Sequence, residues 1–422
     1  MQITLEGYPM NNWRRYGMVL NITVMTALAQ AAYGGGYSGG AGTPANPYQI
    51  GGITDWTALC STSGDWNKSF RLISDINLSG ISITPVGTNM IPFTGSFNGE
   101  DHIVRNALIS LPSGDNVGLF GFLDPGAELR SLGVETVSIT GQECAGGLVG
   151  WNNGGSIISC HVTGTVTGST GGFSTGGLVG RHDLGLITGC HTSVTVKGIS
   201  DMGGLVGTNI GGTIRKCFAL GPVEGSENIG GLVGYQVGGE TALSYARGTV
   251  TGNRIVGGLI GSNYQGALTC CYAAGPVSGS ETVGGLAGGC DDTVVTACYW
   301  DMDVSGLSTS ACGEGRDTDA MTHPYGAGTY TGWDFDVDWN DDVGYTVNNG
   351  YPYLREEVLH PGDLNQDWRM VMSEAIGYLS GWQNGDNPMA YAIRAAYLWQ
   401  NGEAYSYDPE EETPMCWILD AQ

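Results

Sequence analysis

The sequence predicts a mainly β fold: a right-handed parallel β-helix, or solenoid, of about seven coils with a period near 27 residues, followed by a small α-helical calcium-binding module. The first observation behind this prediction is a Gly-Gly-Leu-Val-Gly motif, whose Gly-Leu pair recurs after an outlying first copy at intervals of 30, 27, 27, 27 and 27 residues, at Gly118, Gly147, Gly177, Gly204, Gly231, Gly258 and Gly285. The second is a content of 73 glycines among many β-branched residues, and the third is an acidic loop near the C-terminus. A chain that repeats in this way forms a stack of equivalent coils.

The charge of the chain limits its partners. Sixteen Lys and Arg residues against 41 Asp and Glu residues give a formal net charge of −25 at pH 7. Such a field repels nucleic acid and anionic lipid and attracts cations. We therefore expect no nucleic-acid partner.

Residues 1–31 are predicted to be a secretory signal peptide, so that the mature protein is secreted or lies on the cell surface. An apolar stretch follows Arg14 and Arg15 and ends in small residues, and cleavage is expected after Ala29 or Ala31. Two alternatives stay open: translation can start at Met10, and the segment can remain as an uncleaved anchor. No other segment has the roughly 20 apolar residues of a membrane span, so none is expected after signal cleavage.

The rest of the chain before residue 356 divides into four parts. Residues 32–45 are a Gly-rich leader, 46–116 an N-terminal β region and cap, 117–298 the repeat array, and 299–355 a C-terminal β cap. Each 27-residue unit is expected to hold three short strands, such as 203–209, 213–218 and 223–224. The motif glycines are expected to allow sharp corners and positive φ, while the Leu and Val residues stack inside.

These repeats resemble the GLUG-motif proteins of bacterial surfaces and secretions, over roughly residues 46–355. The resemblance includes Phe93-Thr94-Gly95-Ser96-Phe97-Asn98-Gly99 before the repeats, and Cys298-Tyr299-Trp300-Asp301 with Tyr351-Pro352-Tyr353-Leu354 after them. It implies an adhesive or spacer module. Some such repeats occur in surface zinc peptidases that cleave immunoglobulin A, but no histidine here belongs to the His-Glu-x-x-His helix of a zinc peptidase.

Five of the eleven cysteines fall at one position of successive coils, and Ser244 takes the same position in another coil: they are Cys160, Cys190, Cys217, Cys271 and Cys298. Disulfides between Cys160 and Cys190 and between Cys271 and Cys298 stay open, because the coil spacing is one that a disulfide can span. Stacking as small apolar residues inside the solenoid is favoured. A metal ladder is disfavoured, since no Cys-x-x-Cys pair or nearby His completes a tetrahedral site.

The clearest chemical motif is residues 363–374, which match an EF-hand-type loop for one Ca²⁺ ion. The predicted ligands stand at loop positions 1, 3, 5, 7 and 12: Asp363, Asn365, Asp367, Arg369 through its carbonyl, and Glu374. Calcium prefers six to eight oxygen ligands, which this spacing gathers around one point. Trp368 stands where the usual loop has Gly, which weakens or reshapes the site. The alternative is a capped helix with solvated acids.

Residues 356–407 resemble a dockerin, a calcium-ordered module that attaches secreted proteins to cohesin partners, and 408–422 form an acidic tail. A helix is expected to begin near Ser373 and a second to run over 388–400. The resemblance implies a surface or secreted partner, cohesin-like in kind. A dockerin usually has two calcium loops, whereas residues 384–388 cannot form the second. The alternative role is a calcium-stabilised cap on the solenoid.

Other acidic clusters carry weaker predictions. Asp334, Asp336 and Asp338 alternate with apolar residues and predict an edge strand rather than a metal loop. The pairs Asp291-Asp292 and Asp301 with Asp303 have the residue types of a glycosidase site, but no catalytic residue is assigned. The sequence thus favours a non-catalytic adhesin, spacer or carbohydrate- or protein-binding module, with glycans as candidate ligands of the solenoid face. A polysaccharide-degrading β-helix hydrolase or lyase and a self-assembling surface fibre are the alternatives.

Overall fold

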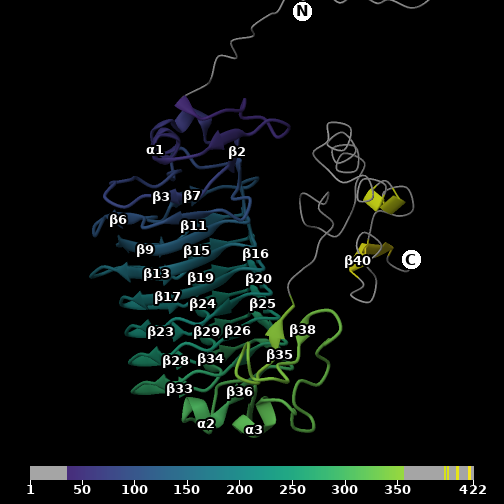
Figure 1. The fold of residues 1–422 in the computed structure, drawn as a ribbon. Coiled ribbons are helices and arrows are strands. Elements are labelled where there is room, and N and C mark those ends of the chain that lie inside the picture. Colours follow the sequence, from purple (N-terminus) through teal and green to yellow (C-terminus); the bar gives the residue numbers. More distant parts are fainter. Residues whose placement is uncertain (1–35, 356–393, 396, 399–404, 408–416, 420–422) are drawn as a thin grey trace, which may run out of the picture.

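A computed structural model describes residues 36–355, 394–395, 397–398, 405–407 and 417–419. Residues 36–355 form a parallel β-solenoid of about nine turns, seen from the side in Figure 1. Seven is therefore an underestimate for the solenoid, although seven strands do stack in the sheet that follows the Gly-Gly-Leu motif. The early turns lack the motif, which is why the repeat count misses them.

Four parallel sheets run along the solenoid axis, with successive strands 27 to 30 residues apart in the repeat region. The ten-stranded sheet contains β1 (Tyr48–Ile50), β2 (Ser69–Leu72), β4 (Ser96–Asn98), β8 (Glu128–Arg130), β12 (Ser156–Ile158), β16 (Leu186–Thr188), β20 (Thr213–Arg215), β25 (Glu240–Ala242), β30 (Ala267–Thr269) and β35 (Val294–Thr296). The seven-stranded sheet contains β7 (Phe120–Leu123), β11 (Val149–Asn153), β15 (Val179–Asp183), β19 (Val206–Ile210), β24 (Val233–Val237), β29 (Ile260–Tyr264) and β34 (Ala287–Asp291).

The other two sheets complete each turn. The six-stranded sheet contains β10 (Ala145–Gly146), β14 (Phe173–Gly176), β18 (Ser200–Gly203), β23 (Glu227–Gly230), β28 (Arg254–Gly257) and β33 (Glu281–Gly284). The fourteen-stranded sheet contains β3 (Ile76–Asn77), β5 (Ile103–Arg105), β6 (Leu108–Ser110), β9 (Gly133–Gly141), β13 (His161–Gly168), β17 (His191–Lys197), β21 (Phe218–Ala219), β22 (Val223–Glu224), β26 (Tyr245–Ala246), β27 (Val250–Thr251), β31 (Tyr272–Ala273), β32 (Val277–Ser278), β36 (Tyr299–Asp301) and β37 (Glu314–Arg316).

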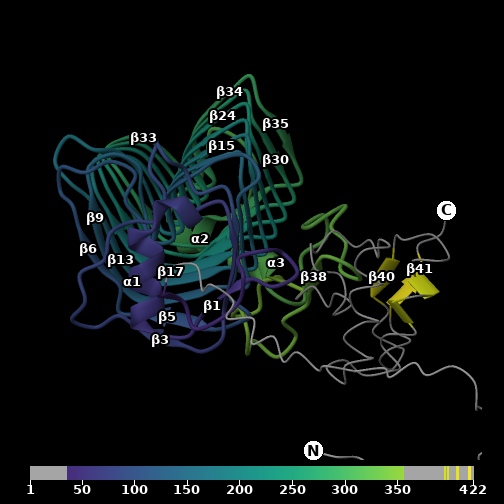
Figure 2. The same cartoon turned by 90° about the horizontal axis from the view of Figure 1, so that it is seen from above.

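One turn shows why three strands per coil is too coarse a prediction. Residues 200–224 form β18, β19, β20, β21 and β22, in four sheets. The chain bends sharply between β18 and β19 at Gly204, and again at Lys216, whose φ is 51°. In Figure 2 the view along the axis shows two lobes, because the outer faces of the six- and seven-stranded sheets diverge from the bend at Gly204.

A helix and an aromatic cluster cover the N-terminal end of the core. Helix α1 (Ile53–Ser61), followed by the 3₁₀ turn η2 (Ser63–Asp65), is an element that the sequence analysis missed. It buries Trp56 fully against Phe97, with ring centroids 5.7 Å apart. The described part of the predicted leader also packs: the Tyr37 ring lies 4.6 Å from the Tyr48 ring, tilted by 33°, and Gly39 pairs with β1.

At the other end, residues 299–355 close the solenoid and wrap onto its side. Helices α2 (Met302–Ser305) and α3 (Thr318–Met321) lie at the end in Figure 1, and the antiparallel pair β38 (Trp339–Asn340) and β39 (Tyr353–Leu354) lies beside the last turns. Trp339 is fully buried against Tyr245 and Tyr272. The predicted edge strand through Asp334 is wrong, because that carboxylate instead accepts hydrogen bonds from the backbone of Asp336 and Val337 in a turn.

The predicted signal peptide, the calcium loop at 363–374 and most of the predicted dockerin-like module lie outside the described residues. Later described pieces include the antiparallel strands β40 (Tyr405–Tyr407) and β41 (Trp417–Leu419). Across the described residues, no helix is long and apolar enough to cross a membrane.

Candidate functional site

The repeated motif builds a corner and carries no reactive group. A Cβ placed on Gly203 would lie 1.9 Å from the carbonyl oxygen of Val206, and one on Gly204 would lie 2.1 Å from that of Gly231 in the next turn. A Cβ on Gly207 would meet the carbonyl carbon of Ser174 at 2.5 Å. The motif glycines are therefore required by close backbone approach. The expected positive φ is wrong for all seven repeat positions: Gly118, Gly147, Gly177, Gly204, Gly231, Gly258 and Gly285.

The cysteines of the repeat are buried thiols: Cys160, Cys190, Cys217, Cys271 and Cys298. Each donates to the carbonyl oxygen two residues before it, as Cys217 does to Arg215 at 3.0 Å. Ser244 makes the same contact with Ala242 at 2.7 Å, which explains how serine fits the position. The disulfides considered between Cys160 and Cys190 and between Cys271 and Cys298 are not formed. Burial also raises the pKa of Cys160 and Cys190, so these thiols are poor nucleophiles.

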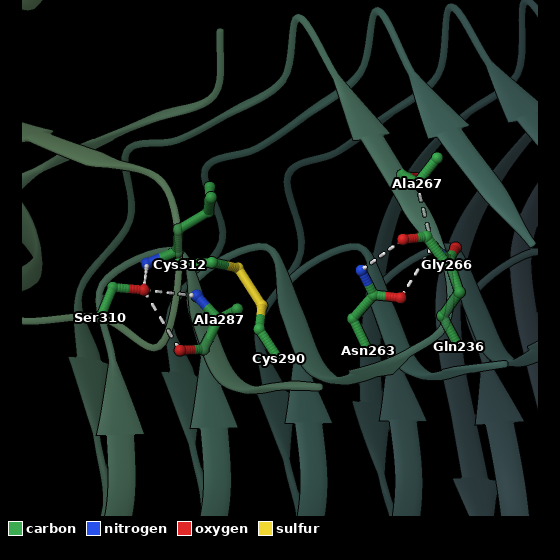
Figure 3. The surroundings of a disulfide bond; sticks show 9 residues. Gln236, Asn263, Gly266, Ala267, Ala287, Cys290, Ser310 and Cys312 are labelled. Atoms are coloured by element: carbon green, nitrogen blue, oxygen red, sulfur yellow. Dashed lines mark hydrogen bonds between the residues drawn. A yellow bond between two sulfur atoms is a disulfide. The ribbon is translucent and has the colours of Figure 1, made fainter. Parts of the chain in front are cut away.

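A ladder of buried amides supports the ridge between the seven- and ten-stranded sheets. Asn209 donates to Gln236 at 3.0 Å, and Gln236 donates to Asn263 at 3.2 Å. Figure 3 shows where this ladder ends: Cys290 occupies the next position in register and forms a disulfide with Cys312. Ser310 beside it binds both backbone groups of Ala287, which covers part of the edge strand β34. The ladder and the disulfide therefore hold the ridge in place.

The ionisable residues that most resemble a catalytic set neutralise one another. Arg105 bridges Asp75 and Glu135, with both nitrogen–oxygen distances 3.0 Å. Glu135 also lies 3.9 Å from His161. A general acid needs a carboxyl with a raised pKa, whereas hydrogen bonding to the backbone of Ile103 lowers the pKa of Asp75. This cluster is an ion-pair network on the outer face of the fourteen-stranded sheet.

The predicted acidic pair Asp301 and Asp303 serves the local fold. Asp301 is fully buried, caps helix α2 through Val304, and accepts a hydrogen bond from Tyr351 at 2.6 Å. Asp303 accepts one from the backbone of Thr318. Among the described residues, no group of three His, Cys, Asp or Glu side chains is arranged to hold a metal ion.

A column of stacked rings on the fourteen-stranded sheet is closed to ligands on its ring faces. It comprises His161, His191, Phe218, Tyr245 and Tyr272, with planes within 8° of parallel and centroids 4.7–5.2 Å apart. Each ring covers its neighbour, and the C-terminal segment covers Tyr272 through Trp333 and Tyr351. We conclude that this column holds the solenoid and its C-terminal segment together.

The outer face of the seven-stranded sheet is different, because its side chains change from turn to turn. The position directly after each motif lies in register along the axis and is occupied by Trp151, Arg181, Thr208, Tyr235, Ser262 and Gly289. Two residues further, a second outward column contains Asn153, Asp183, Ile210, Val237, Tyr264 and Asp291. We call these two columns the variable face. The sequence analysis missed it, although the change of residue after a constant motif is readable from the sequence.

The two tyrosines of the variable face make no specific contact with the other described residues, although Tyr235 is partly buried. The side chains of Tyr235 and Tyr264 make no hydrogen bond, ion pair or aromatic contact with other described residues. Tyr264 is 40% exposed. Trp151, in contrast, lies 4.4 Å below the guanidinium of Arg181 and donates to Asp183 at 3.1 Å. Tyrosine offers a rigid apolar ring and a polar hydroxyl, a combination enriched at recognition surfaces.

A shallow depression lies beside the variable face, on the ridge where the seven- and ten-stranded sheets meet. Its volume is about 320 Å³. Four of its nine lining residues are glycine, and the others include Glu240, Gln265 and Val294. Gln265 follows Tyr264 in the chain and donates to Asp292 at 3.2 Å. The depression is open and polar, without convergent ionisable groups of the kind an active site uses.

Comparison with known proteins supports the prediction that the chain is a GLUG repeat protein. The family model named "The GLUG motif" matches residues 141–167. The chain is 34% identical over 142 residues to halomucin from Haloquadratum walsbyi, a match that covers 31% of this chain and 2% of halomucin. It is 28% identical over 134 residues to a "Putative Gly-rich membrane protein" from Evansella cellulosilytica, covering 30% of this chain and 15% of that protein. The chain thus spans a small part of the curated relatives it matches.

A solved structure shares the fold. The crystal structure of a "putative immunoglobulin A1 protease" from Bacteroides ovatus superposes with a TM-score of 0.51 at 21% sequence identity, over 76% of this chain and 96% of that one. At this identity the likeness concerns the solenoid fold alone.

Proposed function

We propose that this GLUG repeat protein is a secreted or cell-surface, non-catalytic solenoid that binds an external ligand through its variable face, as an adhesin or binding module. The observation that carries the proposal is the pair Tyr235 and Tyr264, two rings without a ring contact or hydrogen bond to the other described residues, on a scaffold where most aromatic rings are packed. A rigid stack with a changing outward column places different side chains about 4.8 Å apart, although Thr208 in the middle of the first column is buried against Ser174. The name of the Evansella relative, a membrane protein, supports a location at the cell envelope.

Binding to surfaces tests this proposal. The fluorescently labelled protein would be applied to immobilised glycans, matrix proteins and envelope preparations, and compared with the double variant Tyr235→Ser with Tyr264→Ser. Loss of most of the bound signal in the double variant is expected. Tyr345→Ser is the matched control, because Tyr345 is 52% exposed but lies in the C-terminal segment, away from the variable face. Equal binding by both variants would refute a role for the variable face.

We further propose that the C-terminal module binds one Ca²⁺ ion and attaches the solenoid to another surface component. The proposed ligands are Asp363, Asn365, Asp367, the carbonyl of Arg369 and Glu374, and support comes from their EF-hand spacing. Calcium titration by calorimetry is expected to give one site that Glu374→Gln weakens by at least tenfold. If Glu374→Gln leaves the heat of calcium binding and the calcium affinity unchanged, the proposed site is wrong.

A separate capture experiment tests attachment. Residues 355–422 would be immobilised with calcium or with chelator and exposed to secreted and envelope proteins of the producing cell. A partner held only with calcium, and lost with Glu374→Gln, supports a dockerin-like role with a cohesin-like partner. If calcium binds but no partner is held, the module is a calcium-stabilised cap on the solenoid.

A further inference from the structure

We propose that the ligand of the variable face is an extended, neutral, β-linked glycan chain that lies along the solenoid axis with about one sugar residue per turn. This inference rests on the proposed function and names its ligand class. The turns of the seven-stranded sheet are strictly in register from β11 to β34. Neighbouring strands lie about 4.8 Å apart, which is close to the advance of a 1,4-linked pyranose in an extended chain. Each sugar residue of a linear glycan would therefore lie opposite the equivalent backbone position of one turn.

The side chains fit sugar chemistry. A pyranose has apolar C–H faces that pack on aromatic rings and hydroxyls that both donate and accept hydrogen bonds. Tyr235 and Tyr264 stand on neighbouring turns, and among the described residues their rings make no aromatic contact and their hydroxyls no hydrogen bond. Ser262 is the register partner of Tyr235 on the next turn and lies two residues before Tyr264 on the same strand, β29. Arg181 and Trp151 lie two and three turns from Tyr235, beyond the buried Thr208, and the Arg181 guanidinium packs over the Trp151 ring.

Charge argues for a neutral chain. In the second column of the variable face, Asp183 is the second residue and Asp291 the last. Asp201, on the adjoining strand β18, accepts hydrogen bonds from Asn228 at 2.7 Å and from Ser200 at 3.1 Å. With a net charge of −25 on the whole chain, a uronate or sulfated polymer would be repelled. Carboxylates are good acceptors for sugar hydroxyls, so the same groups favour an uncharged glycan.

A length series tests this inference on the full chain. Calorimetry with β-1,4-linked gluco-, manno- and xylo-oligosaccharides, from disaccharide to octasaccharide, is expected to show affinity that rises with each sugar. It should level off near five residues, because five turns separate Trp151 from Tyr264 inclusive. Tyr235→Ser should weaken binding of the longest bound ligand about tenfold, as loss of one aromatic contact with its hydrogen bond does. Polygalacturonate should bind at least tenfold more weakly than the best neutral ligand.

Two controls keep the inference falsifiable. Tyr345→Ser should leave the affinity unchanged, and circular dichroism should show that Tyr235→Ser keeps the β spectrum. Absence of binding by every oligosaccharide, or affinity independent of length or of Tyr235, would overturn the glycan assignment. If no glycan binds while the double tyrosine variant still loses binding to protein-coated surfaces, the face recognises a protein, and the proposed function stands without this ligand.

Discussion

Corner residues with positive φ show how individual side chains fit the solenoid. The position after each strand of the seven-stranded sheet lies in the left-handed region in every turn from β11 to β34. Glycine occupies it at Gly154, Gly211 and Gly238, whereas Leu184 adopts φ 55° while 76% exposed. A left-handed conformation costs an ordinary L-residue about 1–2 kcal/mol, and less for Asn. Leu184 therefore carries strain without compensating burial.

Replacing this leucine should stabilise the protein. Leu184→Asn is expected to raise the free energy of unfolding by about 1 kcal/mol, because Asn tolerates the left-handed region and little apolar contact is lost. Urea titration of the two proteins measures the change. Leu220→Asn is the matched control: Leu220 is 42% exposed and is not among the residues with positive φ. A gain of the same size at Leu220 would show that strain at residue 184 is not the cause.

His182 gives the solenoid a dependence on pH. Its ring is fully buried in the amide ladder beside Asn152, and burial lowers its pKa from 6.5 to about 4. The unfolded chain therefore binds a proton between pH 6.5 and 4 that the folded chain excludes. The stability contributed by this difference is complete above pH 6.5 and is lost as the pH falls toward 4.

Replacing His182 by the residue typical of its ladder tests this linkage. Between pH 6.5 and 4, the free energy of unfolding is expected to fall by about 3 kcal/mol less in His182→Asn than in the wild type. Unfolding measurements at steps of half a pH unit give the comparison. Measurement at pH 8, where neither state binds the proton, separates this effect from any change in packing. A variant whose stability falls with pH as steeply as that of the wild type would contradict the assignment.

At the scale of the element, the Gly-Gly-Leu corner is the unit that repeats. Gly204→Ala should lower the unfolding free energy by about 3 kcal/mol, a large overpacking cost, because the new methyl group would lie 2.1 Å from the backbone oxygen of Gly231. Gly64→Ala is the matched control, since a Cβ there meets no atom within 4 Å. Thermal melts of both variants give the comparison. Equal melting temperatures would mean that the corner relaxes and that the motif has another role.

The repeating elements could be predicted from the sequence, but the elements that break the repeat could not. Gly147 and its equivalents give the period directly, because steric need keeps glycine at each corner. The first turns have no such corner and use Phe70 and Phe97 to fill the core, so their strands carry no period. The Cys290–Cys312 disulfide joins a ladder position to a loop outside the repeat, which spacing alone does not reveal. The sequence shows that the residue after each motif varies, but only the strand register of the structure shows that these residues line up on one outer face.

At the scale of the whole molecule, the covered ends bear on self-assembly. A stack of parallel strands grows by addition at its ends unless they are covered. Trp56 of α1 closes the N-terminal end of the core, and Trp300 packs over the corner at Gly285 near the other end. The described solenoid is thus a closed unit at both ends, which disfavours a fibre built by stacking.

Opening one end should therefore create association. Trp56→Ser is expected to expose the core around Phe97 and to give species whose mass rises with protein concentration in light scattering, whereas the wild type should keep one mass over the same range. Ile53→Ser is the matched control, because Ile53 lies on the same helix but is 39% exposed. If Trp56→Ser keeps a constant mass while its circular dichroism stays native, α1 is not what prevents stacking. If the wild type itself forms filaments, the ends are not closed in solution. That result would favour the surface-fibre alternative, which the covered ends of the described solenoid disfavour.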